Sequence, residues 1–135
     1  MSTFLANTLQ RPAYSGQDAY SIAHGMYVFA NAQIGDKVRL KQLYAGTFVT
    51  DVKLINAALG ANVTLSLGFE NVDGSDGTAD DAGLIPVTAA AAAGCTRSNA
   101  APTLLQKDCY LVAVVGGGVA NGQIDTVTGY EFRGI

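Results

Sequence analysis

The sequence is poor in charged residues, and it contains one histidine, two cysteines and no tryptophan. Charged residues make up 14% of its 135 positions, against about 25% in an average soluble protein. Surfaces with so little charge repel other copies of themselves weakly, which favours a subunit of an assembly over a free monomer. The net charge is -3 and lysines and arginines form no cluster. Direct nucleic-acid binding, which needs cations that neutralise phosphates, is therefore not expected.

Long apolar runs and a leader-like start are also missing. No stretch approaches the roughly 20 apolar residues of a membrane span, and residues 1–18 lack a basic segment followed by an apolar one. We therefore expect neither a membrane segment nor a signal peptide. Two cysteines, Cys95 and Cys109, do not make a disulfide framework. They are interpreted as reduced, small apolar side chains, with a single disulfide left open.

Catalytic and metal-binding patterns are scarce as well. His24 is the only histidine, so a cupin-like metal site with several histidines cannot be assembled, and any Ser-His-Asp or Cys-His pair would have to use it. The glycine-rich segment 115–122 lacks the lysine of a phosphate loop, and a hairpin turn explains it better. We expect no catalytic residue, no metal and no cofactor. Converging carboxylates remain open as an alternative, with four candidates: Asp51, Asp108, Asp125 and Glu131.

What the sequence does contain is a series of short segments with apolar residues at every second position. The clearest is 62–70, where Val63, Leu65, Leu67 and Phe69 alternate with polar or small residues, which is typical of a strand with one face in water. About eight strands are predicted in this way: 19–30, 36–43, 47–55, 62–70, 84–87, 102–106, 109–115 and 122–134. One domain with so many short strands indicates an antiparallel β-sandwich of jelly-roll type. An immunoglobulin-like sandwich is the second choice, since neither its tryptophan nor its cysteine spacing is present.

The remaining segments connect or flank these strands. Residues 1–18 are predicted to be an N-terminal arm, either disordered or draped over a neighbour, and residues 19–135 form the sandwich domain. The alanine-rich segment 88–94 is the only helix candidate, because alanine has the highest helix propensity. The link 56–61 suits a hairpin or a tight corner. Residues 72–83 hold four aspartates among glycines. Their spacing does not fit an EF-hand, so a solvated loop is favoured, with a different calcium site as the alternative.

The order of these segments resembles the small capsid decoration, or cement, proteins of tailed bacteriophages. The resemblance covers most of residues 14–134. It rests on "GDKVRL" (35–40), "NAALGANVTLSLGFE" (56–70), the Asp-Gly-rich loop, "NAAPTLL" (99–105), "DCYLVAVVGGG" (108–118) and "TGYEFRG" (128–134). No short diagnostic motif carries it.

The resemblance implies a jelly-roll protein that binds the outer surface of the major capsid protein shell and bridges neighbouring capsomers to stabilise the head. It also implies a dimer or trimer on the exterior of the virion, folded in the host cytoplasm before assembly, with no catalytic site. The expected contacts are apolar anchors of the arm and one basic strand face. These partner-binding candidates are Phe4, Leu5, Leu9, Tyr14, Lys37, Arg39 and Lys41.

Two other functions remain open. A carbohydrate- or receptor-binding jelly roll of a phage fibre or tail would use tyrosines as stacking platforms, with Tyr20, Tyr27, Tyr44 and Tyr130 as candidates, and could use the aspartate loop for calcium. A small hydrolase would depend on His24 or on paired carboxylates.

Overall fold

The computed structural model describes residues 2–6, 9, 20–73, 80–98 and 100–132. Ten strands and no helix are found in these residues. The strands are β1 (Thr3–Leu5), β2 (Tyr20–Ala32), β3 (Lys37–Leu43), β4 (Thr47–Asn56), β5 (Thr64–Asn71), β6 (Asp80–Ala89), β7 (Gly94–Arg97), β8 (Thr103–Leu104), β9 (Cys109–Gly116) and β10 (Ala120–Phe132). The described part of the chain thus holds no helix that could cross a membrane.

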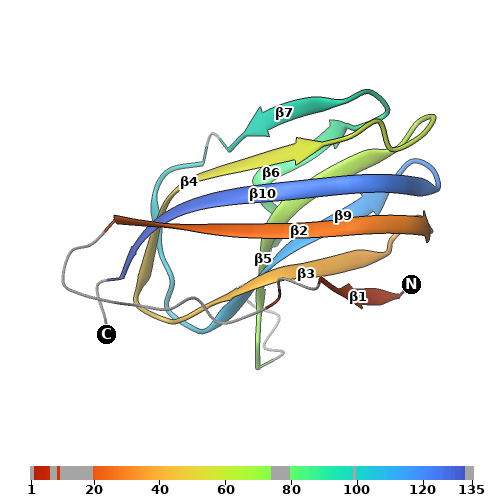
Figure 1. Cartoon of the computed structure of the whole chain (residues 1–135). Coiled ribbons are helices and arrows are strands. Elements are labelled where there is room, and N and C mark those ends of the chain that lie inside the picture. The colour runs from red at the N-terminus through yellow and green to blue at the C-terminus, as the bar shows by residue number, and fades with distance from the viewer. Residues whose placement is uncertain (1, 7–8, 10–19, 74–79, 99, 133–135) are drawn as a thin grey trace.

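The strands form two sheets that face each other (Figure 1). Sheet A has the order β1-β3-β9-β5-β6, and sheet B has the order β2-β10-β4-β7, with β8 paired to β4 as well. All pairs are antiparallel except β1 with β3. Without β1 and β8, four strands remain in each sheet, and their orders, β3-β9-β5-β6 and β2-β10-β4-β7, are those of a jelly roll. The predicted fold class is confirmed.

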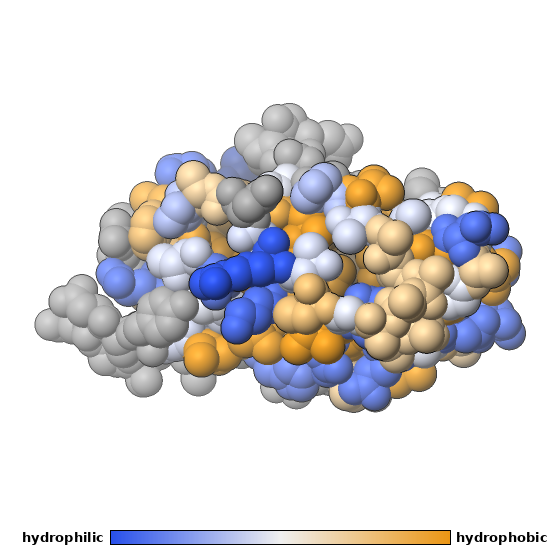
Figure 2. All heavy atoms as spheres, turned by 90° about the horizontal axis from the view of Figure 1, so that it is seen from above, coloured by the Kyte–Doolittle hydropathy of each residue, from blue (hydrophilic) through white to orange (hydrophobic). Residues whose placement is uncertain are grey.

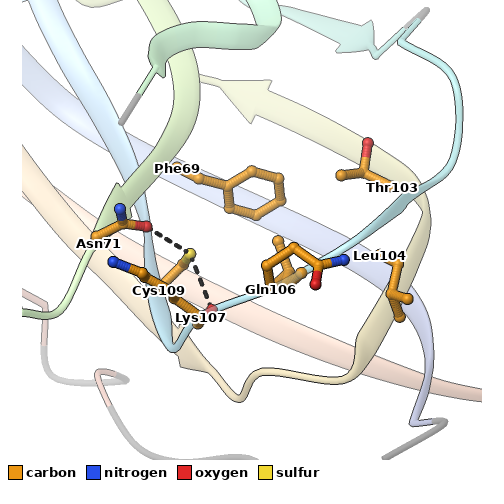
Figure 3. A pocket seen from close by; sticks show the side chains of 8 residues that line it. Phe69, Asn71, Thr103, Leu104, Gln106, Lys107 and Cys109 are labelled. Atoms are coloured by element: carbon orange, nitrogen blue, oxygen red, sulfur yellow. Dashed lines mark hydrogen bonds between the residues drawn. The ribbon is translucent and has the colours of Figure 1, made fainter. Parts of the chain in front are cut away.

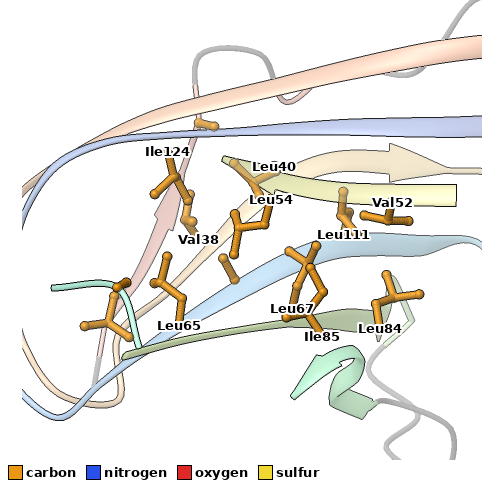
Figure 4. Packing of buried hydrophobic residues seen from close by; sticks show 14 of the residues in the cluster. Val38, Leu40, Val52, Leu54, Leu65, Leu67, Leu84, Ile85, Leu111 and Ile124 are labelled. Carbon is orange, nitrogen blue, oxygen red and sulfur yellow. The ribbon is translucent and has the colours of Figure 1, made fainter. Parts of the chain in front are cut away.

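The core lies between the two sheets and is built from the alternating apolar positions of both (Figure 4). In β3, Val38 and Leu40 point inward and are fully buried, whereas their neighbours Lys37 and Arg39 point outward. The same alternation buries Leu65 and Leu67 of β5, and Ile124 of β10 closes the core from sheet B. Period-two patterning thus fixes which face of each strand is covered.

Each predicted strand coincides at least in part with an observed one, but two observed strands were not predicted. β1 lies within the segment expected to be the arm, and β7 follows the alanine-rich segment. The helix expected at 88–94 does not form: Thr88 and Ala89 end β6, a turn follows, and Gly94 begins β7. Inside this segment Ala90 is buried and bonded by its backbone to Val63 and Leu59. These tertiary bonds replace the bonds that a two-turn helix would make.

The glycine-rich turn after β9 is also different from the prediction. It joins β9 of sheet A to β10 of sheet B, so it is an inter-sheet connection and not a hairpin. Gly117 has a φ of 75°, and a Cβ there would lie 2.0 Å from the Asn62 carbonyl oxygen. Only glycine fits so close to another backbone. The link 56–61 likewise crosses from sheet B to sheet A, as a tight corner would.

The first strand is attached to the sandwich by Asp36, which precedes β3. The Asp36 carboxylate accepts hydrogen bonds from the backbone N–H of Ser2 (2.7 Å) and of Gln33 (2.9 Å). The backbone of β3 continues the attachment, since the Lys37 N–H donates to the Ser2 carbonyl and the Ala6 N–H to the Arg39 carbonyl. Residues 3–5 of the expected arm therefore belong to sheet A, and Ser2 and Ala6 are bonded to its strand β3 and to Asp36.

Candidate interaction site

The predicted basic face lies on the outer side of sheet A, and an acid is built into it. Lys37 and Arg39 of β3 both bind Glu70 of β5, and the Arg39 Nε lies 2.7 Å from a Glu70 carboxylate oxygen. Strand β9 lies between β3 and β5, so these ion pairs span Val112, which is fully buried. The Arg39 guanidinium also lies over the Tyr110 ring, 4.6 Å from its centre, a cation–π contact.

Burial and pairing act in opposite directions on Glu70. Burial alone would raise the pKa of its carboxyl, but the hydrogen bonds and charges of Lys37 and Arg39 outweigh it and leave the pKa below its ordinary value. The Lys37 and Arg39 side chains are only 22% and 32% exposed. This face is therefore an ion-pair cluster in which one carboxylate partly neutralises two cations, instead of an open row of cations. The sequence alone does not identify Glu70 as the partner of Lys37 and Arg39, because it does not show which strands are neighbours.

Lys41, the third predicted cation, differs from the other two. It is half-buried, and burial lowers the pKa of its ammonium group. No ion pair to it is found among the described residues. A bulge between Arg39 and Lys41 breaks the register with β9 and separates it from the cluster.

The predicted arm anchors lie in different environments. Phe4 stacks on Tyr27 of the same chain, with ring centres 5.9 Å apart, and packs against the core. Leu5, its neighbour in β1, is 59% exposed. Leu9 is half-buried, and its N–H donates to the Ala6 carbonyl. Tyr14 lies outside the described residues. Leu5 is thus the described anchor most open to a partner.

His24 lies on the outer face of sheet B, where its Nε2 is 2.9 Å from an Asp125 carboxylate oxygen. Neither cysteine is placed to pair with it. Cys95 is on β7, three strands from β2, or about 14 Å at the usual strand spacing. Cys109 is buried, mainly burial raises its pKa to about 11, and its Sγ contacts the Asn71 side-chain oxygen. A Cys-His pair, which would have to use His24, has no geometric support in the described residues.

The cysteines are both free thiols. Cys109 fits its interpretation as a buried apolar side chain, but Cys95 is exposed on β7. The interpretation of Cys95 as a core side chain is therefore wrong, because β7 is a short edge strand whose residues are largely exposed.

Three of the four carboxylates proposed to converge are instead engaged separately. Asp51 binds Arg97 through two contacts of 2.9 and 3.1 Å, and Arg97 chiefly accounts for a pKa of Asp51 below its ordinary value. Asp108 accepts the Ala45 N–H at 2.8 Å, at one end of the sandwich. Asp125 binds His24 on the outer face of sheet B. These three carboxylates form no common acid–base site.

The tyrosines expected to stack on a sugar are mostly turned inward. Tyr130 is 3% exposed, and Tyr27 lies between Phe4 and Phe29 in ring contacts, with burial raising its pKa. Tyr44 is half-buried, and the Tyr20 side chain lies outside the described residues. Tyr27 and Tyr130 are therefore ruled out as stacking platforms, because a sugar ring needs an exposed aromatic face.

The aspartate loop is described only at its ends. Asp73 lies 3.4 Å from the Lys107 ammonium group, and residues 74–79 lie outside the described residues. Asp80 and Asp81, expected in the loop, already belong to β6. In the described part of the chain, no three histidine, cysteine or acidic side chains are grouped as they would be around a metal.

A small pocket of about 250 Å³ opens between the ends of β5 and β9 and the segment 103–107 (Figure 3). Phe69, Leu104 and Leu105 provide its apolar lining, and the Cys109 thiol donates to Asn71 and to the Lys107 carbonyl at its inner side. Its size is below the usual range for ligand pockets. It offers no paired acid and base.

The exposed apolar residues are scattered over several elements. Ile22 and Val28 of β2, Ile55 of β4 and Val87 of β6 are between 40% and 68% exposed. Seen from above, apolar and polar residues are interspersed over the surface (Figure 2). Ile22 and Val28 were not singled out from the sequence, because segment 19–30 is apolar at both alternating sets of positions.

Three solved structures have a similar fold. A chain from the capsid of Ralstonia phage GP4 matches with a TM-score of 0.76 and 16% identity, over 98% of this chain and 99% of that chain. A chain of the Cyanophage Pam1 capsid asymmetric unit matches with a TM-score of 0.70 and 17% identity, over 92% of each chain. A chain from the capsid of Helicobacter pylori bacteriophage KHP30 matches with a TM-score of 0.66 and 18% identity, over 88% of this chain and 92% of that chain. At these identities the likeness is one of fold.

No protein-family model matches the sequence. No curated protein matches it either.

Proposed function

We propose that the chain is a non-enzymatic structural protein of a phage virion that decorates the outer surface of the capsid and bridges neighbouring capsomers. The observation that carries the proposal is the length of the structural match. The chain and the Ralstonia phage GP4 capsid chain cover each other almost completely. The capsid of Ralstonia phage GP4 therefore contains a chain that consists almost entirely of a β-sandwich of this size.

The surface chemistry supports attachment more than catalysis. Asp51, Asp108 and the His24–Asp125 pair are engaged in separate contacts, and the small pocket has no acid–base pair. The sequence has few charges to keep copies apart. Binding would be reinforced by multivalency, because a molecule already held by one capsomer meets the next at high effective concentration. The major capsid protein is the proposed partner.

The proposed contacts are the N-terminal segment and the face that carries β3. Leu5 and Leu9 are the described apolar anchors, and Tyr14 belongs to the same segment. Phe4 attaches the N-terminal segment to the sandwich through its stacking on Tyr27. On β3, Lys41 is the cation without an ion pair among the described residues, whereas Lys37 and Arg39 already share Glu70. Lys41 is therefore the proposed contact to an acidic capsid surface.

The test is to mix the purified chain with capsids assembled without it, sediment the capsids and image any bound copies. We expect saturable co-sedimentation and density for the sandwich on the outer surface. Leu5→Asp should weaken binding about tenfold, as loss of one buried apolar anchor does. Val87→Asp is the matched control, since Val87 is 68% exposed and lies on β6, away from β1.

If the wild-type chain stayed in the supernatant at every ratio, the proposed function would be wrong. Equal loss of binding in both variants would remove the N-terminal segment as the contact. Binding to a glycan surface, with none to capsids, would favour the carbohydrate-binding alternative.

A further inference from the structure

The edges of the two sheets differ in how they are protected against pairing with another strand. An unpaired edge exposes backbone N–H and C=O groups, and proteins commonly protect it with short strands, charges, proline or bulges. Three described edges have such features. β1 has three residues, and β7 has four and carries Arg97. β6 contains Pro86 and has two register shifts against β5.

β2 is the fourth edge, and it has none of these features along most of its length. It is 13 residues long and contains no lysine, arginine, aspartate, glutamate or proline. Its pairing with β10 is continuous from Tyr20 to Phe29, and the bulge comes only near Asn31. Sheet B places β10 on one side of β2, and no described strand pairs with its other side (Figure 1).

The side chains of this edge strand are apolar where they are most exposed. Ile22 is 67% exposed and Val28 is 55% exposed, and both lie on the outer face of sheet B with His24 between them. Among the described side chains on the outer face of β2, His24 is the only titratable one, and it binds Asp125 of the same chain. In the described structure the strand therefore offers a second copy an edge with no strand paired to it, exposed apolar side chains and no lysine, arginine, aspartate or glutamate.

We propose that β2 pairs antiparallel with β2 of a second copy, about a two-fold axis at Gly25, so that the two B sheets become one continuous sheet. A two-fold interface uses the same surface on both copies, and an antiparallel pair of identical strands meets this condition. Around Gly25, Ile22 of each copy lies opposite Val28 of the other. Directly opposed side chains on one face are close enough to pack together. The dimer thus contains two equivalent Ile22–Val28 contacts, and each of them buries the two most exposed apolar side chains of the strand.

The first test is the mass of the full chain by analytical ultracentrifugation over a concentration series. We expect twice the chain mass of 13.9 kDa. In the double variant Ile22→Lys with Val28→Lys, lysines face each other across the axis, and like charges directly opposed are destabilising. We expect dimer affinity to fall at least tenfold, with unchanged β-sheet circular dichroism, because both side chains are exposed.

The second test addresses the register. In the variant Ile22→Glu with Val28→Lys, each glutamate faces a lysine of the other copy, so the dimer should return. Ile55→Lys is the control that separates an effect of the edge strand from an effect of any new charge on the outer face of sheet B. Ile55 lies on the same outer face of sheet B but on β4, away from the edge, and its variant should remain dimeric.

Four outcomes would overturn the proposal. They are a wild-type chain that stays at a single chain mass or forms a trimer, a dimer indifferent to the two lysines, a dimer dissociated by Ile55→Lys, and a charge-paired variant as weak as the double-lysine one. Hydrogen exchange gives a measurement without any substitution. Backbone amides of residues 21–29 that point away from β10 should become protected as concentration rises, and unchanged exchange would contradict the pairing.

Discussion

At the scale of single residues, Asp36 attaches strand β1 to the sandwich. Its carboxylate accepts the backbone N–H groups of Ser2 and Gln33, and these bonds hold its pKa below the ordinary value of 3.8. A lowered folded pKa means stabilisation that is fully present above 3.8 and is lost as pH falls through the folded value. We therefore predict that β1 detaches on acidification, measured as lower protection of the Lys37 and Ala6 amides relative to their intrinsic hydrogen exchange at each pH.

Asp36→Asn should produce the same detachment at neutral pH and remove its dependence on pH. An asparagine side chain has one acceptor and one donor group, so it cannot accept both N–H groups with two oxygens. Asp73→Asn is the control, because Asp73 is exposed and its ion pair with Lys107, at 3.4 Å, involves neither β1 nor β3. If Asp36→Asn left both amides as protected as in the wild type, the carboxylate would not be the attachment.

Thr128 is the second residue whose environment leads to a prediction. It is fully buried on the inner face of β10, and its hydroxyl has no hydrogen-bond partner in the described structure. A buried hydroxyl without a partner costs free energy, whereas an apolar group of the same shape does not. Thr128→Val should raise the free energy of unfolding by about 1 kcal/mol in urea denaturation.

Thr50→Val provides the comparison for this prediction. The Thr50 hydroxyl donates to the Gly129 carbonyl at 3.1 Å, so the same substitution there should destabilise the protein by about 1 kcal/mol. Stabilisation of both variants, or of neither, would show that the missing partner at Thr128 is not what determines the difference.

At the scale of elements, strand positions could be predicted because alternation is a local property. Val63, Leu65 and Leu67 alternate with polar or small residues and are all buried, and β5 begins directly after Val63 and includes the two leucines. The alanine segment shows the limit of local propensity. Its residues favour a helix when taken alone, but Ala90 is held by backbone bonds to Val63 and Leu59 from distant parts of the chain. Tertiary contacts of this kind are not visible in a local pattern.

Pairing between strands was beyond what alternation can provide. Consecutive strands of the jelly roll mostly belong to different sheets, so neighbours in sequence are rarely neighbours in a sheet. For this reason the 116–122 turn looked like a hairpin, and Glu70 could not be recognised as the partner of Lys37 and Arg39. The free edge of β2 was hidden for the same reason, since an edge is defined only by the order of all strands.

At the scale of the whole molecule, the edge strand and the proposed capsid contact make one joint prediction. A dimer that bridges two capsomers binds with both copies, and the second contact forms at high effective concentration. The variant Ile22→Lys with Val28→Lys should then bind capsids at least tenfold more weakly than the wild type, even though its capsid-facing residues are intact. Titration of capsids with each protein, followed by sedimentation, measures this difference.

The charge-paired variant Ile22→Glu with Val28→Lys separates dimer formation from a direct role of these two side chains. If it recovers both the dimer and tight capsid binding, the loss in the double-lysine variant comes from lost bivalency. If the double-lysine variant is monomeric but binds capsids as tightly as the wild type, the proposal that a dimer bridges capsomers is wrong, while the proposal of capsid binding still stands. If the wild-type dimer forms but never binds capsids, decoration is wrong and the β2 pairing still stands. The two proposals can therefore fail independently. The β2 dimer is tested by the mass of the protein in solution, whereas capsid binding is tested by co-sedimentation with the capsids.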